Sequence, residues 1–436
     1  MMIRQFWTVI VSVAFVLPNA EAATTAPTWP SSVDELEDIM LLNTGYQSRG
    51  FADFVTPCSF SAQGNGHIAS AEWIRTAFHD MATGNVFLGQ GGLDASLVFE
   101  LGGDNIGTAF ATTLTTYAPY LSSRSSMADI IAMGIYTAVR SCGGPAVPIR
   151  TGRIDATAAG PPGVPLPQNS LFTFENQFAR TGFNTTEMIA VTACGHTVGG
   201  VHAGNFPQIV PPGTVPNDYK LMDSTTVFDE RIASEYVSGN STDPLTVGPS
   251  KAAGMDSDAK VFAGDGNVTI KAMADPATFA SMCKTMLQKM IEVVPSGTVL
   301  TDPIVPYEVK PNALQLTLLK AGSQILFAGE IRVRTTVRPA SKIASVKLVY
   351  KDRSGGKGCG GCTISTQPKG TAAGFDDSFT VSTSLNIVLA IKQHLGYFLA
   401  NNPTVLLILL FLALQNFHLG LQRARNPRRW SDGDAR

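Results

Sequence analysis

Ala71-Glu72-Trp73-Ile74-Arg75-Thr76-Ala77-Phe78-His79-Asp80 is the most informative segment of this chain. Its apolar residues recur at helical spacing and predict an amphipathic helix over residues 70–81. Arg75 and His79 are four positions apart, so they lie on one face of that helix. An imidazole beside a fixed cation suits acid–base work on a small polar substrate. Such a pair is more often simply solvated, so its meaning depends on the segments that follow.

Three further segments have helical periodicity and recognisable starts. Ser126 can cap the segment 126–140, which is apolar nearly all round and predicts a buried helix. Asn184 precedes a helix at 185–196 with a capping-box glutamate, and Asp275-Pro276 places proline in the first turn of another helix. We predict that residues 23–300 form one mainly helical unit with long, functional Pro/Gly-rich loops.

The character of the sequence changes after Pro303. Runs at 314–318, 324–337 and 343–350 are rich in β-formers and partly alternate, so we expect a small β-sandwich-like domain over residues 301–385. Cys359-Gly360-Gly361-Cys362 lies in a loop of this part. Because no second CxxC accompanies it, a local disulfide or structural loop is favoured over a redox or metal motif.

Both ends of the chain predict targeting segments. Residues 1–22 have a basic start, an apolar stretch and a small-residue cleavage site, as in a secretory signal peptide. The tail, residues 386–436, contains an apolar segment at 403–421 followed by arginines, which predicts a transmembrane span. A lipid-anchor signal and an error in the gene model are the alternatives. The formal net charge of -2 leaves no basic surface that would indicate a nucleic-acid partner.

Several segments together resemble one known family. Arg75 and Phe78-His79-Asp80, followed by Gly92-Leu93-Asp94-Ala95-Ser96, resemble the distal motif of the plant, fungal and bacterial haem peroxidase superfamily. Gly195-His196-Thr197 resembles its proximal motif. The resemblance covers roughly residues 40–295 and looks most like the secreted fungal class. It implies a mainly α fold in which haem b lies between a distal and a proximal half.

On the distal side the resemblance implies a catalytic set of Arg75, His79 and Asn105. His79 would move a proton between the two oxygens of hydrogen peroxide, while Arg75 would stabilise the departing charge. Asn105 would accept a hydrogen bond from the His79 ring and so set which ring nitrogen is basic. Phe78 would contact the haem, at a position where intracellular relatives commonly have tryptophan.

On the proximal side the resemblance implies that His196 is the axial ligand of the haem iron. His202 is a competitor, but it lies outside the motif. The family orients its proximal histidine with an aspartate, which strengthens electron donation to iron. Asp265 is the best match for that aspartate, and Asp256 and Asp258 remain alternatives.

The resemblance also implies two calcium ions and two disulfides. Clustered carboxylate, hydroxyl and carbonyl oxygens suit calcium. A capped turn rich in Asp and Ser is an alternative explanation for the proximal set, and paired buried thiols are an alternative to the second disulfide. The distal calcium ligands would be Asp80, Gly92 through its carbonyl, Asp94 and Ser96; the proximal ligands Thr197, Asp223, Thr225 and Asp229; and the disulfides Cys58–Cys142 and Cys194–Cys283.

The expected function is that of a haem peroxidase, which reduces hydrogen peroxide while oxidising small, phenolic donors by one electron at a time. His202 and Val191 stand where manganese- and lignin-oxidising relatives have specialised side chains, so those two activities are not favoured. We expect a protein that is secreted or anchored at the cell surface, with a membrane or cell-wall association through its C-terminal part. The alternatives are a cell-surface structural or adhesion protein with a vestigial peroxidase domain, and a catalase-like enzyme.

Overall fold

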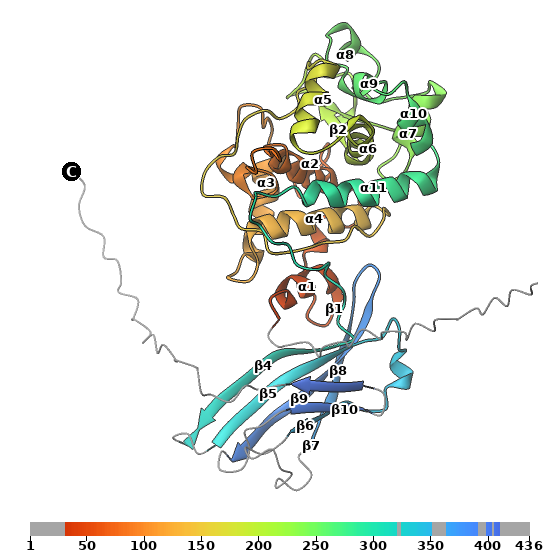
Figure 1. The fold of residues 1–436 in the computed structure, drawn as a ribbon. Coiled ribbons are helices and arrows are strands. Elements are labelled where there is room, and N and C mark those ends of the chain that lie inside the picture. Colours follow the sequence, from red (N-terminus) through yellow and green to blue (C-terminus); the bar gives the residue numbers. More distant parts are fainter. Residues whose placement is uncertain (1–30, 321–323, 351–362, 391–397, 403–404, 410–436) are drawn as a thin grey trace, which may run out of the picture.

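The computed structural model describes residues 31–320, 324–350, 363–390, 398–402 and 405–409. Figure 1 shows a helical unit (residues 31–300) beside a β unit (residues 309–409), with α1 (Asp34–Leu41) between them. Three predictions fall outside the described residues: the signal segment 1–22, the Cys359–Cys362 loop and most of the apolar segment 403–421.

Within the described residues, the helical unit contains eleven α-helices. The four helices predicted from periodicity and caps are confirmed as α2, α4, α6 and α11. Ser126, Asn184 and Asp275 each accept a hydrogen bond from a backbone N–H in the first turn of the helix that follows. The helices after α1 are α2 (Ala69–Met81), α3 (Ala109–Tyr117), α4 (Met127–Ser141), α5 (Leu171–Arg180), α6 (Thr185–His196), α7 (Arg231–Ser238), α8 (Pro249–Ala252), α9 (Ser257–Phe262), α10 (Val268–Met273) and α11 (Pro276–Ile291).

Helix α2 lies at the centre of this unit, in contact with α3, α4, α6 and α11. Its Trp73 is buried and packs against Phe51 and Tyr117, with ring centroids 4.8 Å away in each case. Helix α4 is buried along almost its whole length, as its continuous apolar sequence predicts. One face of α2 is therefore held rigidly in the core, which fixes the direction of its opposite face.

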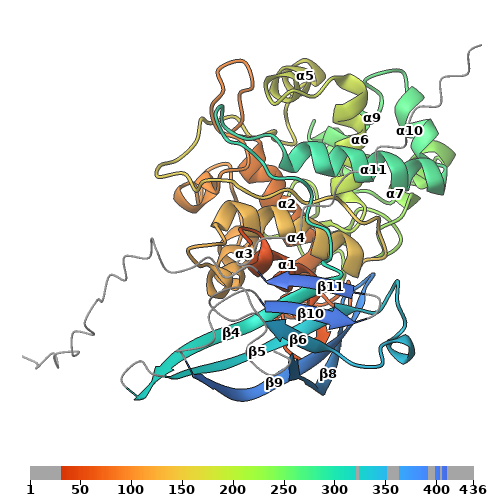
Figure 2. The same ribbon diagram turned by 60° about the horizontal axis from the view of Figure 1, so that its bottom comes forward.

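The β unit consists of two antiparallel sheets that lie against each other (Figures 1 and 2), as expected for a sandwich-like domain. The larger sheet has the order β1-β8-β9-β5-β4 and the smaller one β11-β10-β6-β7. A short pair, β2 (Gly200–His202) and β3 (Tyr219–Leu221), belongs to the helical unit. The remaining strands are β1 (Thr44–Gly45), β4 (Val309–Leu319), β5 (Gln324–Arg334), β6 (Lys347–Tyr350), β7 (Thr363–Ser365), β8 (Gln367–Ala373), β9 (Ser378–Ala390), β10 (Phe398–Asn402) and β11 (Val405–Leu409).

The predicted end of the β domain at residue 385 is wrong. Strand β9 runs through that position to Ala390, and β10 and β11 extend the smaller sheet to Leu409. Strand β1 comes from the N-terminal part of the chain but pairs with β8, so the larger sheet also begins earlier than predicted. A short strand that pairs with a segment far away in the sequence contains too few residues for its alternation to be recognised from the sequence.

The predicted transmembrane segment at 403–421 is not supported. Its described part, Val405–Leu409, is a strand paired with β10. A short apolar run fits a strand or a helix equally well by periodicity, which explains the wrong expectation. No helix in the described ranges has the length and apolar composition needed to cross a bilayer.

A buried ionic cluster joins the two units. Glu37 and Asp38 on α1 meet Lys310 on β4 and Arg332 on β5, and all four side chains are largely buried. The Lys310 Nζ lies 2.8 Å from Glu37 Oε2 and 2.9 Å from Asp38 Oδ1, while Arg332 pairs with both carboxylates. The two positive and two negative charges balance, so the cluster fixes α1 against the larger sheet.

Candidate active site

Helix α2 presents His79 on the face that points away from the Trp73 core. The ring is 8% exposed, and its Nδ1 lies 2.7 Å from Asn105 Oδ1. The Asn105 Nδ2 donates to the Glu100 carbonyl at 2.8 Å, so Oδ1 is the acceptor and His79 Nδ1 the donor. Burial, and then the charge of Arg75, lowers the pKa of His79 to about 3. His79 is therefore a neutral imidazole whose Nε2 is free to accept a proton.

Arg75 lies one turn before His79 and keeps its charge in a buried setting. Burial lowers its pKa to about 10, still far above neutrality. The guanidinium donates to the Ile106 carbonyl at 3.2 Å and stands over the Phe110 ring, 4.5 Å from its centroid. The same ring lies 4.6 Å from His79, so Phe110 separates and positions both side chains. Sequence reasoning missed Phe110, because an apolar residue in a helical pattern has no signal beyond core packing.

His196, the last residue of α6, is held by Asp258 rather than by Asp265. Its Nδ1 lies 2.6 Å from Asp258 Oδ2, and the side chain of Asp258 is 1% exposed. Burial lowers the pKa of His196, but the Asp258 carboxylate outweighs this and raises the pKa above its ordinary value. The His196 side chain is still 34% exposed, so its free Nε2 edge borders an open space.

The expectation that Asp265 orients His196 is wrong. The Asp265 carboxylate instead accepts the backbone N–H groups of Val268 and Thr269, at 2.9 and 3.1 Å, and so caps the start of α10. Asp258, at the first turn of α9, is the alternative that the sequence left open. His202 does not compete with His196, because its ring stacks between those of His67 and Tyr219.

The two histidines lie on neighbouring helices. Helices α2 and α6 are in contact, and the charge of Arg75 lowers the pKa of His79 and opposes protonation of His196. A narrow, apolar crevice beside α2 is lined by Phe78, Met81, Pro165 and Phe178, among others. Each imidazole is fixed through Nδ1 by its own acceptor, Asn105 for His79 and Asp258 for His196.

A cluster of oxygen atoms forms at the end of α2. Asp80 is fully buried and accepts the N–H groups of Ala95 and Leu97, at 2.8 and 3.0 Å. Burial raises the pKa of Asp80 to about 8 and also raises that of Asp94. The Ser96 Oγ is buried with no hydrogen-bond partner among the described residues. A bound cation would satisfy this hydroxyl and keep both carboxyls ionised, so the donor set fits calcium.

Gly92 lies beside the end of α2, where its N–H donates to the Thr83 hydroxyl at 3.2 Å. Its φ is +103°, and a Cβ would lie 2.5 Å from the Val293 carbonyl oxygen, so only glycine fits. The loop that brings Gly92 beside the end of α2 therefore depends on this residue.

The second predicted calcium set is also brought together. The Thr197 Oγ donates to the Asp229 carbonyl at 2.6 Å and lies 3.4 Å from Asp223 Oδ2, while the Thr225 N–H donates to Asp223 Oδ1 at 2.8 Å. Burial raises the pKa of Asp223 to about 7. Where the chain is described, no three His, Cys, Asp or Glu side chains gather to hold a metal. Any ion here would depend on hydroxyl and carbonyl oxygens as well.

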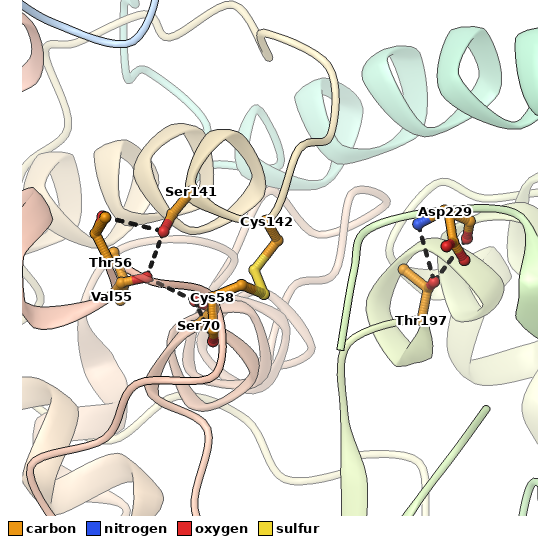
Figure 3. Close-up of a disulfide and its surroundings, with 8 residues drawn as sticks. All are labelled: Val55, Thr56, Cys58, Ser70, Ser141, Cys142, Thr197 and Asp229. Atoms are coloured by element: carbon orange, nitrogen blue, oxygen red, sulfur yellow. Dashed lines mark hydrogen bonds between the residues drawn. A yellow bond between two sulfur atoms is a disulfide. The ribbon is translucent and has the colours of Figure 1, made fainter. Parts of the chain in front are cut away.

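Two disulfides stabilise the elements that hold these side chains. Cys58 is joined to Cys142 and Cys194 to Cys283, the pairs that the resemblance implies. Figure 3 shows the first disulfide, which joins the loop before α2 to the end of α4, and the Thr197–Asp229 contact farther away. Ser70 and Ser141 both donate to the Val55 carbonyl beside it. The second disulfide joins α6, which bears His196, to α11.

Comparisons with known proteins agree with this geometry. The family model described as Peroxidase matches residues 59–263. A WSC domain-containing protein of Arthroderma benhamiae is 67% identical over 356 residues, which are 81% of this chain and 49% of that protein. The chain therefore spans about half the length of that relative.

Named peroxidases match shorter segments. A putative L-ascorbate peroxidase of Arabidopsis thaliana is 32% identical over 29% of this chain and 40% of its own length. A mitochondrial cytochrome c peroxidase of Yarrowia lipolytica is 37% identical over 22% of this chain and 31% of its own length. The segment 59–263, which contains His79, Asn105, His196 and Asp258, is therefore a peroxidase domain similar to those of the haem peroxidase superfamily.

Proposed function

We propose that this protein is a haem-dependent peroxidase that reduces hydrogen peroxide and oxidises small, phenolic donors. The observation that supports this best is the pair of imidazoles around Arg75, each held at Nδ1 so that Nε2 stays free. The neutral ring of His79 suits proton transfer. The ring of His196, which is hydrogen-bonded to the Asp258 carboxylate, suits binding to a metal.

His196 would bind the iron of haem b through Nε2, and Phe78 would pack beside the haem. Asp258 would hold the ring in the correct tautomer and make its free nitrogen a stronger donor. When bound, the haem supplies the redox chemistry by which electrons pass one at a time from the donor to peroxide.

The distal residues would manage the proton. His79 Nε2 accepts a proton from the nearer oxygen of peroxide, because Asn105 holds the other ring proton on Nδ1. The same nitrogen then returns that proton to the farther oxygen, which leaves as water. Arg75 donates hydrogen bonds to the charge that develops on this oxygen, and its burial strengthens that interaction.

Two calcium ions would stabilise the site, one near Asp80 and one near Thr197. The distal ion would use Asp80, the Gly92 carbonyl, Asp94 and Ser96, where the unpartnered Ser96 hydroxyl supports it. The proximal ion would use Thr197, Asp223, Thr225 and Asp229. Both clusters adjoin a histidine of the site, so each ion would stabilise the end of a functional helix.

The protein would act outside the cell or at its surface. The two disulfides favour an oxidising compartment, in agreement with the signal-like N-terminus. The second candidate is a structural or adhesion protein of the cell surface. The observation that favours this second candidate is the separate β unit, which buried charges fix to α1. A function of the helical unit alone would not account for it.

Variants of the two site histidines test this proposal. We expect His79→Ala to keep the Soret band after haem reconstitution but to react with peroxide about 10²–10⁴-fold more slowly, since it lacks the general base. His196→Ala should bind haem poorly, and His202→Ala should keep a normal Soret band. The measurements are the visible spectrum and stopped-flow rates with peroxide.

If the wild-type protein gave no Soret band after reconstitution, the adhesion role would replace the enzymatic one. Oxygen release from peroxide without any donor would instead indicate catalase-like activity.

A further inference from the structure

Three asparagines in the described part of the chain stand in sequons, the N-x-S/T sequences that receive N-linked glycans in secreted proteins. They are Asn184, Asn240 and Asn267, each with a threonine two positions later. The oligosaccharyltransferase modifies the side-chain amide nitrogen of the asparagine and binds the hydroxyl of that threonine at the same time. A sequon is therefore usable in a folded protein only where both side chains are exposed.

The sequon at the start of α6 meets this condition, because Asn184 and Thr186 are both exposed. The Asn184 Oδ1 accepts the Glu187 N–H at 2.9 Å, and the Asn184 N–H donates to Glu187 Oε2 at 2.9 Å. The capping box therefore uses the amide oxygen of Asn184 and not its Nδ2, which is the nitrogen that a glycan would occupy. Since the amide is planar and its oxygen faces the first turn, Nδ2 is directed away from that turn.

The other two sequons do not meet the condition in the fold. Asn240 is exposed, but the Thr242 hydroxyl is buried. Asn267 is only partly exposed, and Thr269 is 5% exposed. The Thr269 hydroxyl also donates to Asp265 at 2.5 Å. A glycan at either asparagine would have to be attached before its segment folds, whereas Asn184 stays accessible afterwards.

We propose that Asn184 carries an N-linked glycan on Nδ2 and that this glycan leaves the cap of α6 intact. The proposal rests on the proposed passage of the chain to the outside of the cell. In the transfer, a C–N bond forms between Nδ2 and the anomeric carbon of the first sugar. The bond from that carbon to the diphosphate of a lipid-linked oligosaccharide breaks, and Nδ2 loses one proton. The product is still an amide, so Oδ1 continues to accept the Glu187 N–H.

The first measurement maps the glycan on full-length protein secreted from a eukaryotic host with an added leader peptide. Enzymatic release of the glycan in heavy-oxygen water converts a modified asparagine into a labelled aspartate, which peptide mass spectrometry detects. We expect the label at Asn184 in the wild type. Thr186→Ala should abolish it, while Thr186→Ser, the matched control, retains a hydroxyl and should keep it. An unlabelled Asn184 in the secreted wild type would overturn the proposal.

The second measurement tests accessibility in the folded state. Protein made in a bacterial periplasm has an oxidising route to disulfides but receives no such glycan. Incubation of this folded protein with a purified oligosaccharyltransferase and its lipid-linked donor should modify Asn184 and leave Asn240 and Asn267 unchanged. Modification of the other two sites in preference to Asn184 would contradict the argument from exposure.

The third measurement concerns the cap. Secreted wild-type protein should unfold at the same denaturant concentration as secreted Thr186→Ala or at a higher one, because the glycan leaves Oδ1 in place. A lower midpoint for the glycosylated protein would show that the glycan breaks the cap, which overturns that part of the proposal. None of the three measurements requires haem or the chain's own N-terminal segment. Failure of the proposed enzymatic function would therefore appear separately, as a missing Soret band.

Discussion

Ser96, in the distal oxygen cluster, has a buried hydroxyl with no hydrogen-bond partner among the described residues. If calcium binds there, Ser96→Ala removes one of its oxygen ligands and should weaken calcium binding by about tenfold, the equivalent of about 1.4 kcal/mol. Titration calorimetry of the calcium-depleted protein measures this directly. Ser281→Ala, on the exposed face of α11, is the matched control and should bind calcium normally. Equal affinity in both variants would remove Ser96 from the ligand set.

Helix α6 shows how an element positions a functional residue. Its capping box pairs Asn184 with Glu187, and Glu187 also contacts Lys289 on α11 at 2.6 Å. Burial of Glu187 is outweighed by its hydrogen bonds to Lys289 and the Asn184 N–H, so its pKa is lowered. A carboxylate of this kind stabilises the fold above its unfolded pKa and loses that effect as pH falls through the folded value. Glu187→Gln should therefore cost ~0.5 kcal/mol at neutral pH.

The same difference should shrink toward zero in acid, as the pH falls from the ordinary pKa of a glutamate through the lower folded value and the wild-type carboxylate becomes protonated. Chemical unfolding of both proteins across this range provides the test. A constant difference at every pH would show that Glu187 acts through packing alone.

On the scale of the whole molecule, the ionic cluster between α1 and the larger sheet decides whether the two units unfold together. Lys310→Met leaves two buried carboxylates with Arg332 as their one cation, so one negative charge is uncompensated and the interface should be destabilised by about 3–5 kcal/mol. We expect calorimetry to resolve two transitions in this variant and one in the wild type. Glu37→Gln combined with Lys310→Met removes both charges and should restore much of the coupling. A single, unshifted transition in Lys310→Met would contradict this account.

The sequence predicted the parts of the site that lie on periodic helices and not those on irregular loops. His79 and His196 are fixed by α2 and α6, whose caps and apolar faces are visible in the sequence. Asp258 could not be separated from Asp256 and Asp265, because loop geometry alone decides which of them reaches His196. In the sequence alone, Lys310 has the character of a surface lysine, because its partner Glu37 is 273 residues away and only the fold brings the two together.

The position of α1 has a consequence for synthesis of the chain. Glu37 and Asp38 emerge from the ribosome early, yet their cations follow 272 to 295 residues later. The first helix therefore leaves the exit tunnel with two carboxylates that cannot be buried until β4 and β5 have been translated. Peroxidase-domain folding would pause with α1 undocked, and ribosome-bound nascent chains that stop before residue 309 should remain open to proteases at this helix.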